Sequence, residues 1–175
     1  MKRILTLMFC SIFLFTSCGD DGPPGPPGPQ GEVGDYIVGI TYEYDVDFTY
    51  FPEENLHSAF LEFPPTDKPS DGILVYRGAV IGGIQTWSLI PQNFFLPEGI
   101  IQYVYTHTDQ DVELIIDGNY NLSNLSTQYT QNQVFRVIVV PSDPEAFASQ
   151  TGVDLSNMEA VMKSLNIQDN DIIMM

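Results

Sequence analysis

Closely spaced acidic side chains offer the first candidate chemistry in this sequence, the binding of a cation. Glu43, Asp45 and Asp47 alternate along one segment, and carboxylate oxygens are ligands for hard cations. The segment Asp169-Asn170-Asp171 resembles the start of a calcium-binding loop but lacks the glycine and the distal glutamate of that loop. We favour a solvated strand face for the first group and a turn for the second, and therefore predict no metal ion or other cofactor.

Histidines and nucleophiles offer little that would support catalysis. His57 and His107 stand in no HExxH motif, and the sequence contains neither a GxSxG nucleophile elbow nor a GxxxxGK[ST] phosphate-binding loop. His107 continues the alternating face of Tyr103 and Tyr105, so we expect it to be packed or to lie at the rim of a sheet. We predict no catalytic residues and expect that the protein is not an enzyme.

Aromatic side chains offer binding chemistry, because exposed rings stack against sugars. The chain has one tryptophan and nine tyrosines. In a β-sandwich most of these rings pack in the core or in cross-strand pairs, which is the simpler interpretation. The candidate ligand platform consists of Tyr42, Tyr44, Trp87, Tyr103 and Tyr105.

The thiol of Cys18 is the candidate for covalent lipid attachment. Residues 1–17 open with two basic residues, continue through an apolar run and end in small residues, which is typical of a secretory signal peptide. The apolar run 4–15 is shorter than the ~20 residues of a membrane-spanning helix. Phe15-Thr16-Ser17-Cys18 resembles the bacterial lipobox, with Phe15 where leucine is usual. The sequence therefore predicts a lipid anchor at Cys18, and the mature chain then keeps no thiol for a disulfide.

Two acidic residues directly behind the lipid-attachment cysteine bear on localisation. Asp20 and Asp21 resemble the surface-export signal of Bacteroidetes lipoproteins. They predict an anchor on the outer face of the cell outer membrane, with outer-membrane lipid as the partner of acylated Cys18. The alternative is that both residues only solvate the start of a linker and that the anchor faces the periplasm.

Glycine recurs at every third position after Cys18, with proline between, and this is the pattern of collagen. A single proline-rich chain of this kind is an extended spacer, roughly 50 Å long at ~3.1 Å per residue. The alternative is a triple-helical stalk, which five triplets would stabilise only marginally. We favour the spacer and a monomer, with a homotrimer as the alternative. The glycines in register are Gly19, Gly22, Gly25, Gly28, Gly31 and Gly34.

Composition indicates a tethered, strongly acidic domain. The formal net charge is −17, and without residues 1–17 four basic residues remain against 23 acidic ones, which gives −19. This charge disfavours nucleic acid and anionic membrane surfaces as partners, and it suits cations, basic partners or simple solubility. We divide the chain into a signal peptide (1–17), an anchor with a collagen-like linker (18–34) and one domain (35–175).

The domain is predicted to be all-β over most of its length. Residues 36–50 alternate between apolar and polar side chains, which indicates one half-buried strand. Gly82-Gly83 separates two further apolar runs and predicts a tight hairpin. The run 134–140, VFRVIVV, is apolar on both faces and is therefore expected at the centre of a sheet. Together with shorter strands at 58–63, 94–96, 100–106 and 112–117, these segments predict an antiparallel β-sandwich of Greek-key type with about seven strands.

The C-terminal part of the chain changes to helical spacing. Ser156 and Glu159 form a capping-box pattern ahead of apolar residues at helical intervals, which predicts a short helix over 157–165. Residues 172–175 are expected to add an edge strand. The polar connection 118–132 has room for one helical turn.

Several segments together resemble a known family. These are the lipobox, the GPPGPPGPQG triplets, QTWSLIPQ (85–92), YTQNQVFRVIVVP (129–141) and the DLSNMEAVMKSLNI tail. The chain resembles the collagen-like lipoproteins found in Bacteroidetes genomes, and the resemblance covers most of its length. It implies a lipid-anchored envelope protein and carries over no reaction, ligand or functional residue.

The sequence thus predicts a lipid-anchored cell-envelope protein that displays a β-sandwich on a short collagen-like stalk in a structural or adhesive role. The alternative function is a surface module that binds a glycan, a peptide or a cation. An enzyme is the third class, and it would need a pocket with converging acids or histidines that no linear motif reveals.

Overall fold

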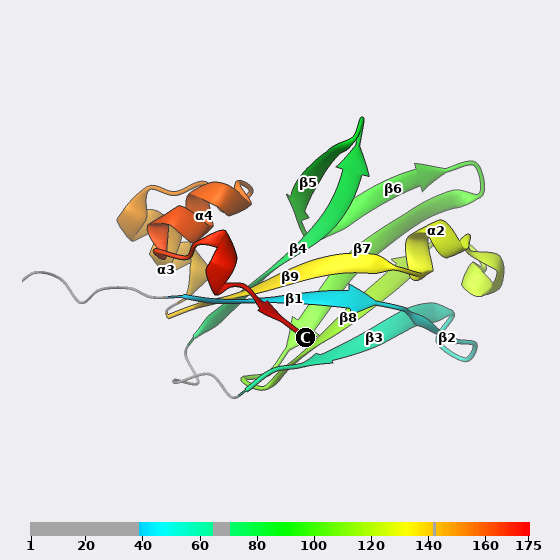
Figure 1. Ribbon diagram of the computed structural model, residues 1–175. Coiled ribbons are helices and arrows are strands. Elements are labelled where there is room, and N and C mark those ends of the chain that lie inside the picture. Colours follow the sequence, from blue (N-terminus) through cyan, green and yellow to red (C-terminus); the bar gives the residue numbers. More distant parts are fainter. Residues whose placement is uncertain (1–38, 65–70, 142) are drawn as a thin grey trace, which may run out of the picture. The chain divides into compact units, whose positions relative to one another are not determined.

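Two five-stranded sheets form the domain (Figure 1). The computed structural model describes residues 39–64, 71–141 and 143–175, which all belong to the unit Asp35–Met175. We call the sheet with strand order β10-β1-β9-β4-β5 the first sheet and the sheet with order β2-β3-β8-β7-β6 the second sheet. The fold is all-β with a few short helices, as predicted, but it has ten strands instead of about seven.

In the described part of the chain the strands pair antiparallel, except that β10 pairs in parallel with β1. The first sheet contains β1 (Ile40–Val46), β4 (Gly72–Ile81), β5 (Ile84–Leu89), β9 (Gln133–Val140) and β10 (Ile173–Met174). The second sheet contains β2 (Thr49–Phe51), β3 (Leu56–Glu62), β6 (Gln92–Leu96), β7 (Gly99–His107) and β8 (Asp111–Gly118).

The faces that the two sheets turn toward each other bury one apolar cluster, which we call the inner core. The alternation of the sequence supplies it with alternate residues from β1, β8 and β9, from the first half of β4 and from the middle of β7. Phe135 of β9 is fully buried there, and its ring lies 6.0 Å from Phe48 and 6.1 Å from Tyr103. As predicted, β9 is central in its sheet, between β1 and β4.

Of the segment predicted as one strand over 36–50, residues 36–38 lie outside the described residues, and the rest forms two strands in different sheets. β1 ends at Val46, and β2 begins at Thr49 in the second sheet. Between them the amide N–H of Phe48 donates a 2.7 Å hydrogen bond to the carbonyl of Thr130 instead of continuing the ladder. Phe48 still points into the inner core, so the alternation of buried and exposed side chains continues across the break.

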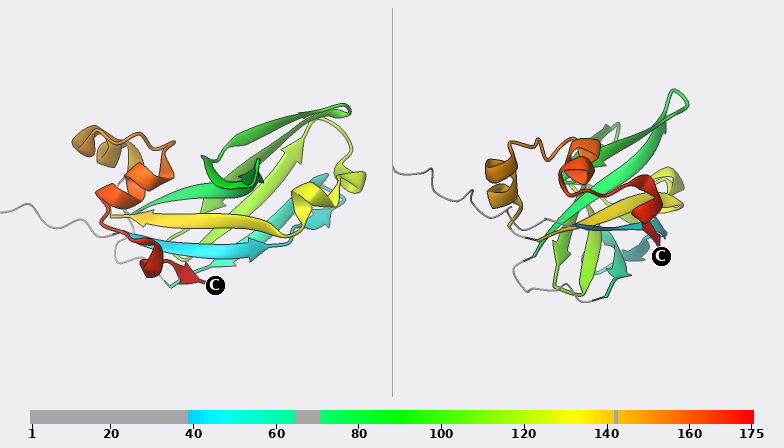
Figure 2. Two further views of the ribbon diagram at one scale, coloured as in Figure 1. Left: turned by 45° about the horizontal axis from the view of Figure 1, so that its top comes forward. Right: turned by 60° about the vertical axis from the view of Figure 1, so that its left-hand side comes forward.

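The hairpin of β4 and β5 has the turn that the sequence predicts. Gly82 and Gly83 have φ values of 61° and 84°, a left-handed backbone that glycine adopts without strain. The hairpin projects beyond the neighbouring strands in Figure 1 and in the right-hand view of Figure 2. Val80, Ile81 and Ile84 near its tip are each about two-thirds exposed.

Short helices occupy the connection after β8 and the C-terminal tail. They are η2 (Leu122–Asn124), α2 (Thr127–Thr130), α3 (Pro144–Thr151), α4 (Met158–Ser164) and η3 (Asp169–Asp171). The sequence did not lead us to expect α3, although Asp143 caps its first N–H groups, Pro144 opens it and Gly152 ends it at φ 70°. α4 lies where a helix was predicted, but its N-cap is Asn157 and not Ser156, whose hydroxyl instead donates to Asp154.

The helical tail covers part of the face of the first sheet that points away from the inner core. We call the apolar cluster there the outer core; β4, β9, α3, α4 and the segment after α4 contribute to it. Tyr76 of β4 is fully buried in it, and its hydroxyl donates a 2.6 Å hydrogen bond to the carbonyl of Leu155. Among the described residues, none of the helices has the length and apolar character needed to cross a membrane.

Candidate functional site: a groove beside Trp87

A groove of about 980 Å³ lies where the tail meets the outer face of the first sheet. One wall comes from β5 and β9, and the other from α4 and the segment that follows it. We call it the Trp87 groove. Its lining residues are Gln85, Trp87, Arg136, Met158, Glu159, Met162, Lys163, Asn166, Ile167, Gln168, Asp169 and Asn170.

A glycine lets the tryptophan lie close to the sheet. Gly78 of β4 is the direct register partner of Trp87 on β5. A Cβ atom at this position would come within 3.0 Å of Trp87 Cζ3 and within 2.7 Å of Gln85 Nε2. The missing side chain therefore leaves the space above β4 that the indole and the Gln85 amide occupy.

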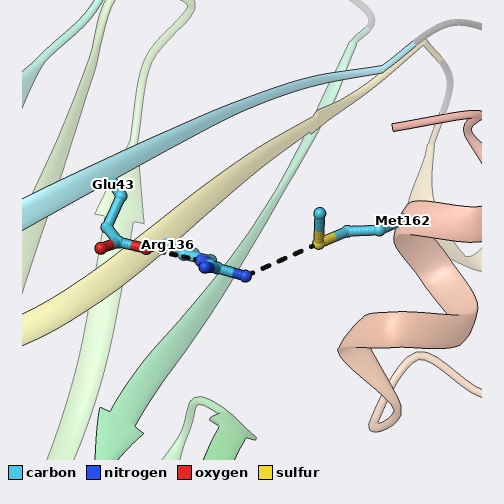
Figure 3. A network of polar contacts seen from close by, with 3 residues as sticks. All are labelled: Glu43, Arg136 and Met162. Atoms are coloured by element: carbon cyan, nitrogen blue, oxygen red, sulfur yellow. Dashed lines mark hydrogen bonds and ion pairs between the residues drawn. The ribbon is translucent and has the colours of Figure 1, made fainter. Parts of the chain in front are cut away.

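Arg136 on β9 fixes the orientation of the indole across the intervening strand β4. Its Nε donates a 2.7 Å hydrogen bond to Glu43 Oε2, and its Nη1 lies 3.9 Å from Met162 Sδ (Figure 3). Its guanidinium carbon is 4.2 Å from the centre of the Trp87 ring, within the range of a cation–π interaction. β1, β9, β5 and α4 thus meet at one arginine, which joins the sheet to the tail.

The charges that line the groove cancel. Arg136 and Lys163 contribute two positive charges, and Glu159 and Asp169 contribute two negative ones. The chain has only four basic residues after residue 17, so half of them line this groove. In a chain with a formal charge of −17, the groove is a locally balanced surface.

The predicted aromatic platform does not exist as an exposed surface. Tyr42, Tyr44 and Tyr103 are 4%, 7% and 1% exposed and belong to the inner core, and Tyr105 packs against it. Trp87 is directed to the opposite face of the first sheet, against the outer core. The period-two alternation that made these residues candidates is also the reason that the tyrosines point inward.

Backbone carbonyls satisfy the hydroxyls of three of these tyrosines. Tyr44 donates to Glu62 at 2.8 Å, Tyr103 to Tyr129 at 2.5 Å and Tyr105 to Ile73 at 2.8 Å. Burial raises the pKa of Tyr44 to about 12, and it raises the pKa of Tyr103 to about 12 although the Arg77 cation opposes the shift. These rings are structural, with their polar atoms paired inside the sandwich.

The acidic residues considered as cation ligands each have different contacts. Glu43 pairs with Arg136, Asp45 is exposed, and Asp47 Oδ1 accepts a 2.7 Å hydrogen bond from the N–H of Asn132. The segment Asp169–Asp171 forms the turn η3, in which Asp171 accepts from the N–H of Gln168. Within residues 39–64, 71–141 and 143–175, no three acidic, histidine or cysteine side chains gather in a way that could hold a metal ion.

The two histidines lie apart from the groove. His107 is exposed at the end of β7, with its ring centre 6.1 Å from that of Tyr105, which agrees with the expected rim position. His57 is buried, with Nε2 3.0 Å from the carbonyl oxygen of Leu122 and its ring beside Tyr50.

A buried arginine is a feature that the sequence reasoning missed. Arg77 of β4 points into the inner core, where its Nη2 donates a 2.6 Å hydrogen bond to Gln133 Oε1. Its guanidinium carbon lies 4.8 Å from the ring centre of Tyr103 and 5.2 Å from that of Phe94. The signal in the sequence was a single charge in the apolar run ILVYRGAV. Arg77 anchors β4 to the second sheet through two rings.

The residues predicted for anchoring, export and the collagen-like register lie outside the described residues. They are Cys18, Asp20, Asp21, Gly19, Gly22, Gly25, Gly28, Gly31 and Gly34. A comparison of the chain with family models, curated proteins and solved structures found no match.

Proposed function

We propose that the protein is a collagen-like lipoprotein that is anchored through acylated Cys18 on the outer face of the outer membrane and displays its β domain in a structural or adhesive role. The observation that carries this proposal is the order of segments: a signal peptide, a lipobox cysteine, two acids, glycine in a third-position register and then a folded domain. Its partners are outer-membrane lipid and a surface glycan or protein. The role requires no catalysis.

The domain that would be displayed consists of two five-stranded sheets and short helices. We describe it as a sandwich of Greek-key type. This description is supported by the long connection between β8 and β9, which returns the chain from the second sheet to the centre of the first.

The anchor is tested by metabolic labelling with a palmitate analogue. Cys18→Ser should abolish the label, because the acylated thiol is lost. Cys10→Ser is the matched control, since it removes the other cysteine of the chain and should leave the label unchanged. Equal labelling of parent and Cys18→Ser would refute the lipid anchor.

Surface display is tested by protease treatment of intact cells. Asp20→Ala with Asp21→Ala should reduce cleavage of the domain while total protein stays constant. Asp45→Ala with Glu53→Ala removes the same charge from exposed positions of the domain and should leave cleavage unchanged. If both double variants are cleaved like the parent, the two acids do not direct export.

The stalk is tested by sedimentation equilibrium and circular dichroism. We expect a monomer, and Gly25→Ala should leave mass and melting temperature unchanged. In a triple helix the same change would place methyl groups at the crowded axis and lower the melting temperature, whereas Gln30→Ala would be tolerated. A trimer with a collagen-like signal that only Gly25→Ala removes would overturn the spacer.

The second candidate function is a surface binding module, and the Trp87 groove favours it. The groove combines an oriented aromatic ring with amide and charged side chains in one concave surface, the usual composition of a small-ligand site.

A further inference from the structure

We propose that the Trp87 groove binds a neutral oligosaccharide. The proposal rests on the second candidate function, because it names the ligand class of that binding site.

Trp87 forms an aromatic wall of the groove. Its ring is partly exposed, Arg136 from β9 contacts it, and the absence of a side chain at Gly78 lets it lie close to the sheet. A ring whose orientation is fixed before binding loses little conformational freedom on binding, and its face suits the C–H groups of a sugar ring. The tyrosines of the predicted platform offer no such surface, since Tyr42, Tyr44 and Tyr103 are buried and Tyr105 packs against the inner core.

The side-chain amides of Gln85, Asn166 and Asn170 line the groove and have no protein partner in the described part of the chain. Each amide offers two N–H donors and one carbonyl acceptor, which matches adjacent sugar hydroxyls that both donate and accept.

The formal charges of the lining sum to zero, because Arg136 and Lys163 are matched in number by Glu159 and Asp169, and Arg136 also pairs with Glu43. The groove therefore offers no net positive charge to an acidic saccharide, and the negative field of the whole chain would repel it. The balance therefore selects a neutral ligand.

A volume of about 980 Å³ lies at the upper end of the ~300–1,000 Å³ range of small-molecule sites. This size suits a short oligosaccharide better than a single sugar.

The fluorescence of Trp87 reports on ligand binding in the groove, because Trp87 is the only tryptophan in the sequence. The full protein, purified in lauryldimethylamine oxide to avoid a sugar-based detergent, is titrated with cellohexaose, maltohexaose, xylohexaose, mannohexaose and chitohexaose. Oligogalacturonate is the acidic comparator. At least one neutral hexaose should shift the Trp87 emission and protect it from acrylamide quenching, and oligogalacturonate should do neither.

Calorimetric titration of variants then shows where the saccharide binds. Trp87→Ala should weaken binding by about ten-fold or more, which corresponds to ~1.4 kcal/mol. Gln85→Ala, an exposed position whose loss does not threaten the fold, should weaken it several-fold. Phe95→Ala is the matched control, because this ring is 80% exposed on the hairpin of β6 and β7 and does not line the groove. Equal binding by all three variants would place the saccharide elsewhere and overturn the proposal.

Two further titrations separate the inference from the function on which it rests. A random-sequence peptide library and calcium chloride probe the other ligand classes. If either shifts the Trp87 emission and no neutral hexaose does, the binding function stands and the saccharide assignment fails. If no probe has an effect, both fail, whereas the lipid anchor is judged by its own labelling experiment. Preferential binding of oligogalacturonate would contradict the charge argument.

Discussion

The two faces of the first sheet are buried in different ways. Its inner face meets a second complete sheet, and the resulting core contains residues from both sheets. In the described part of the chain, its outer face meets the short helices α3 and α4 and the segments beside them, which pack on β4 and β9. The inner face is enclosed, whereas the outer face is covered in part.

This difference explains where a ligand site can form. The fold uses two prominent polar groups of the inner core for its own hydrogen bonds: Tyr103 donates to a backbone carbonyl and Arg77 to Gln133. At the border of the outer core, Trp87 and Gln85 remain in contact with open space. A partly covered sheet face thus supplies both a rigid floor and accessible side chains.

The largest expected effect comes from the inner core. Phe135→Ala should lower the free energy of unfolding by ~3–5 kcal/mol, through lost apolar burial and the cavity left among Phe48 and Tyr103. Urea denaturation followed by the Trp87 emission measures it. A loss below ~1 kcal/mol would show that the two sheets do not share a close-packed core.

A smaller effect is expected from the outer core, because fewer elements surround it. Leu165→Ala, at a fully buried position, should cost ~2–4 kcal/mol. Hydrogen exchange should show faster exchange in α3 and α4, with little change in β7 and β8. Equal acceleration in both sheets would mean that the two cores unfold as one.

The buried tyrosines should make the stability of the sandwich depend on pH in the alkaline range. The pKa values of Tyr44 and Tyr103 are raised to about 12 by burial, above the unfolded value of ~10. Their contribution to stability is complete below about pH 10 and is lost as the pH rises to 12, because the unfolded chain releases these protons first. Tyr103→Phe should flatten the decline in the urea midpoint between pH 10 and pH 12. An unchanged slope would argue against its burial.

The smallest expected effect is at glycines with left-handed backbone. Gly82→Ala in the hairpin and Gly152→Ala after α3 should each cost ~1 kcal/mol, from the backbone conformation alone. Neither added methyl group would touch another atom within 4 Å, so the two losses should be alike. A much larger loss at one site would indicate a contact that forms only in solution.

The β part of the fold was largely predictable, because it follows from local periodicity. Alternation placed Tyr42, Tyr44 and Val46 on one buried face, and Gly82-Gly83 indicated the hairpin. The break after Val46 was not predictable, since the alternation continues through it and only the distant carbonyl of Thr130 reveals the change of sheet. The predicted count of about seven strands was too low, in part because the segment over 36–50 contains both β1 and β2.

The groove was not predictable from the sequence. Trp87, Arg136 and Lys163 come from three elements far apart in the chain, and their meeting depends on the register of β9, β4 and β5. Gly78 carries no signal by itself, because its role appears only when the ring of its cross-strand partner is in place. Helix α3 could have been found, since Asp143-Pro144 and Gly152 bracket it.

An open outer face at Trp87 is the feature on which the proposed binding site depends most, and acrylamide quenching of the single tryptophan tests it directly. The Stern–Volmer constant of the folded protein is compared with that of the same protein in guanidinium chloride, where the indole is fully accessible. We predict intermediate quenching, because the ring is partly exposed and Arg136 covers one side. A folded-state constant near zero would show that the groove is closed, and it would contradict both the contrast between the two faces and the binding site derived from it.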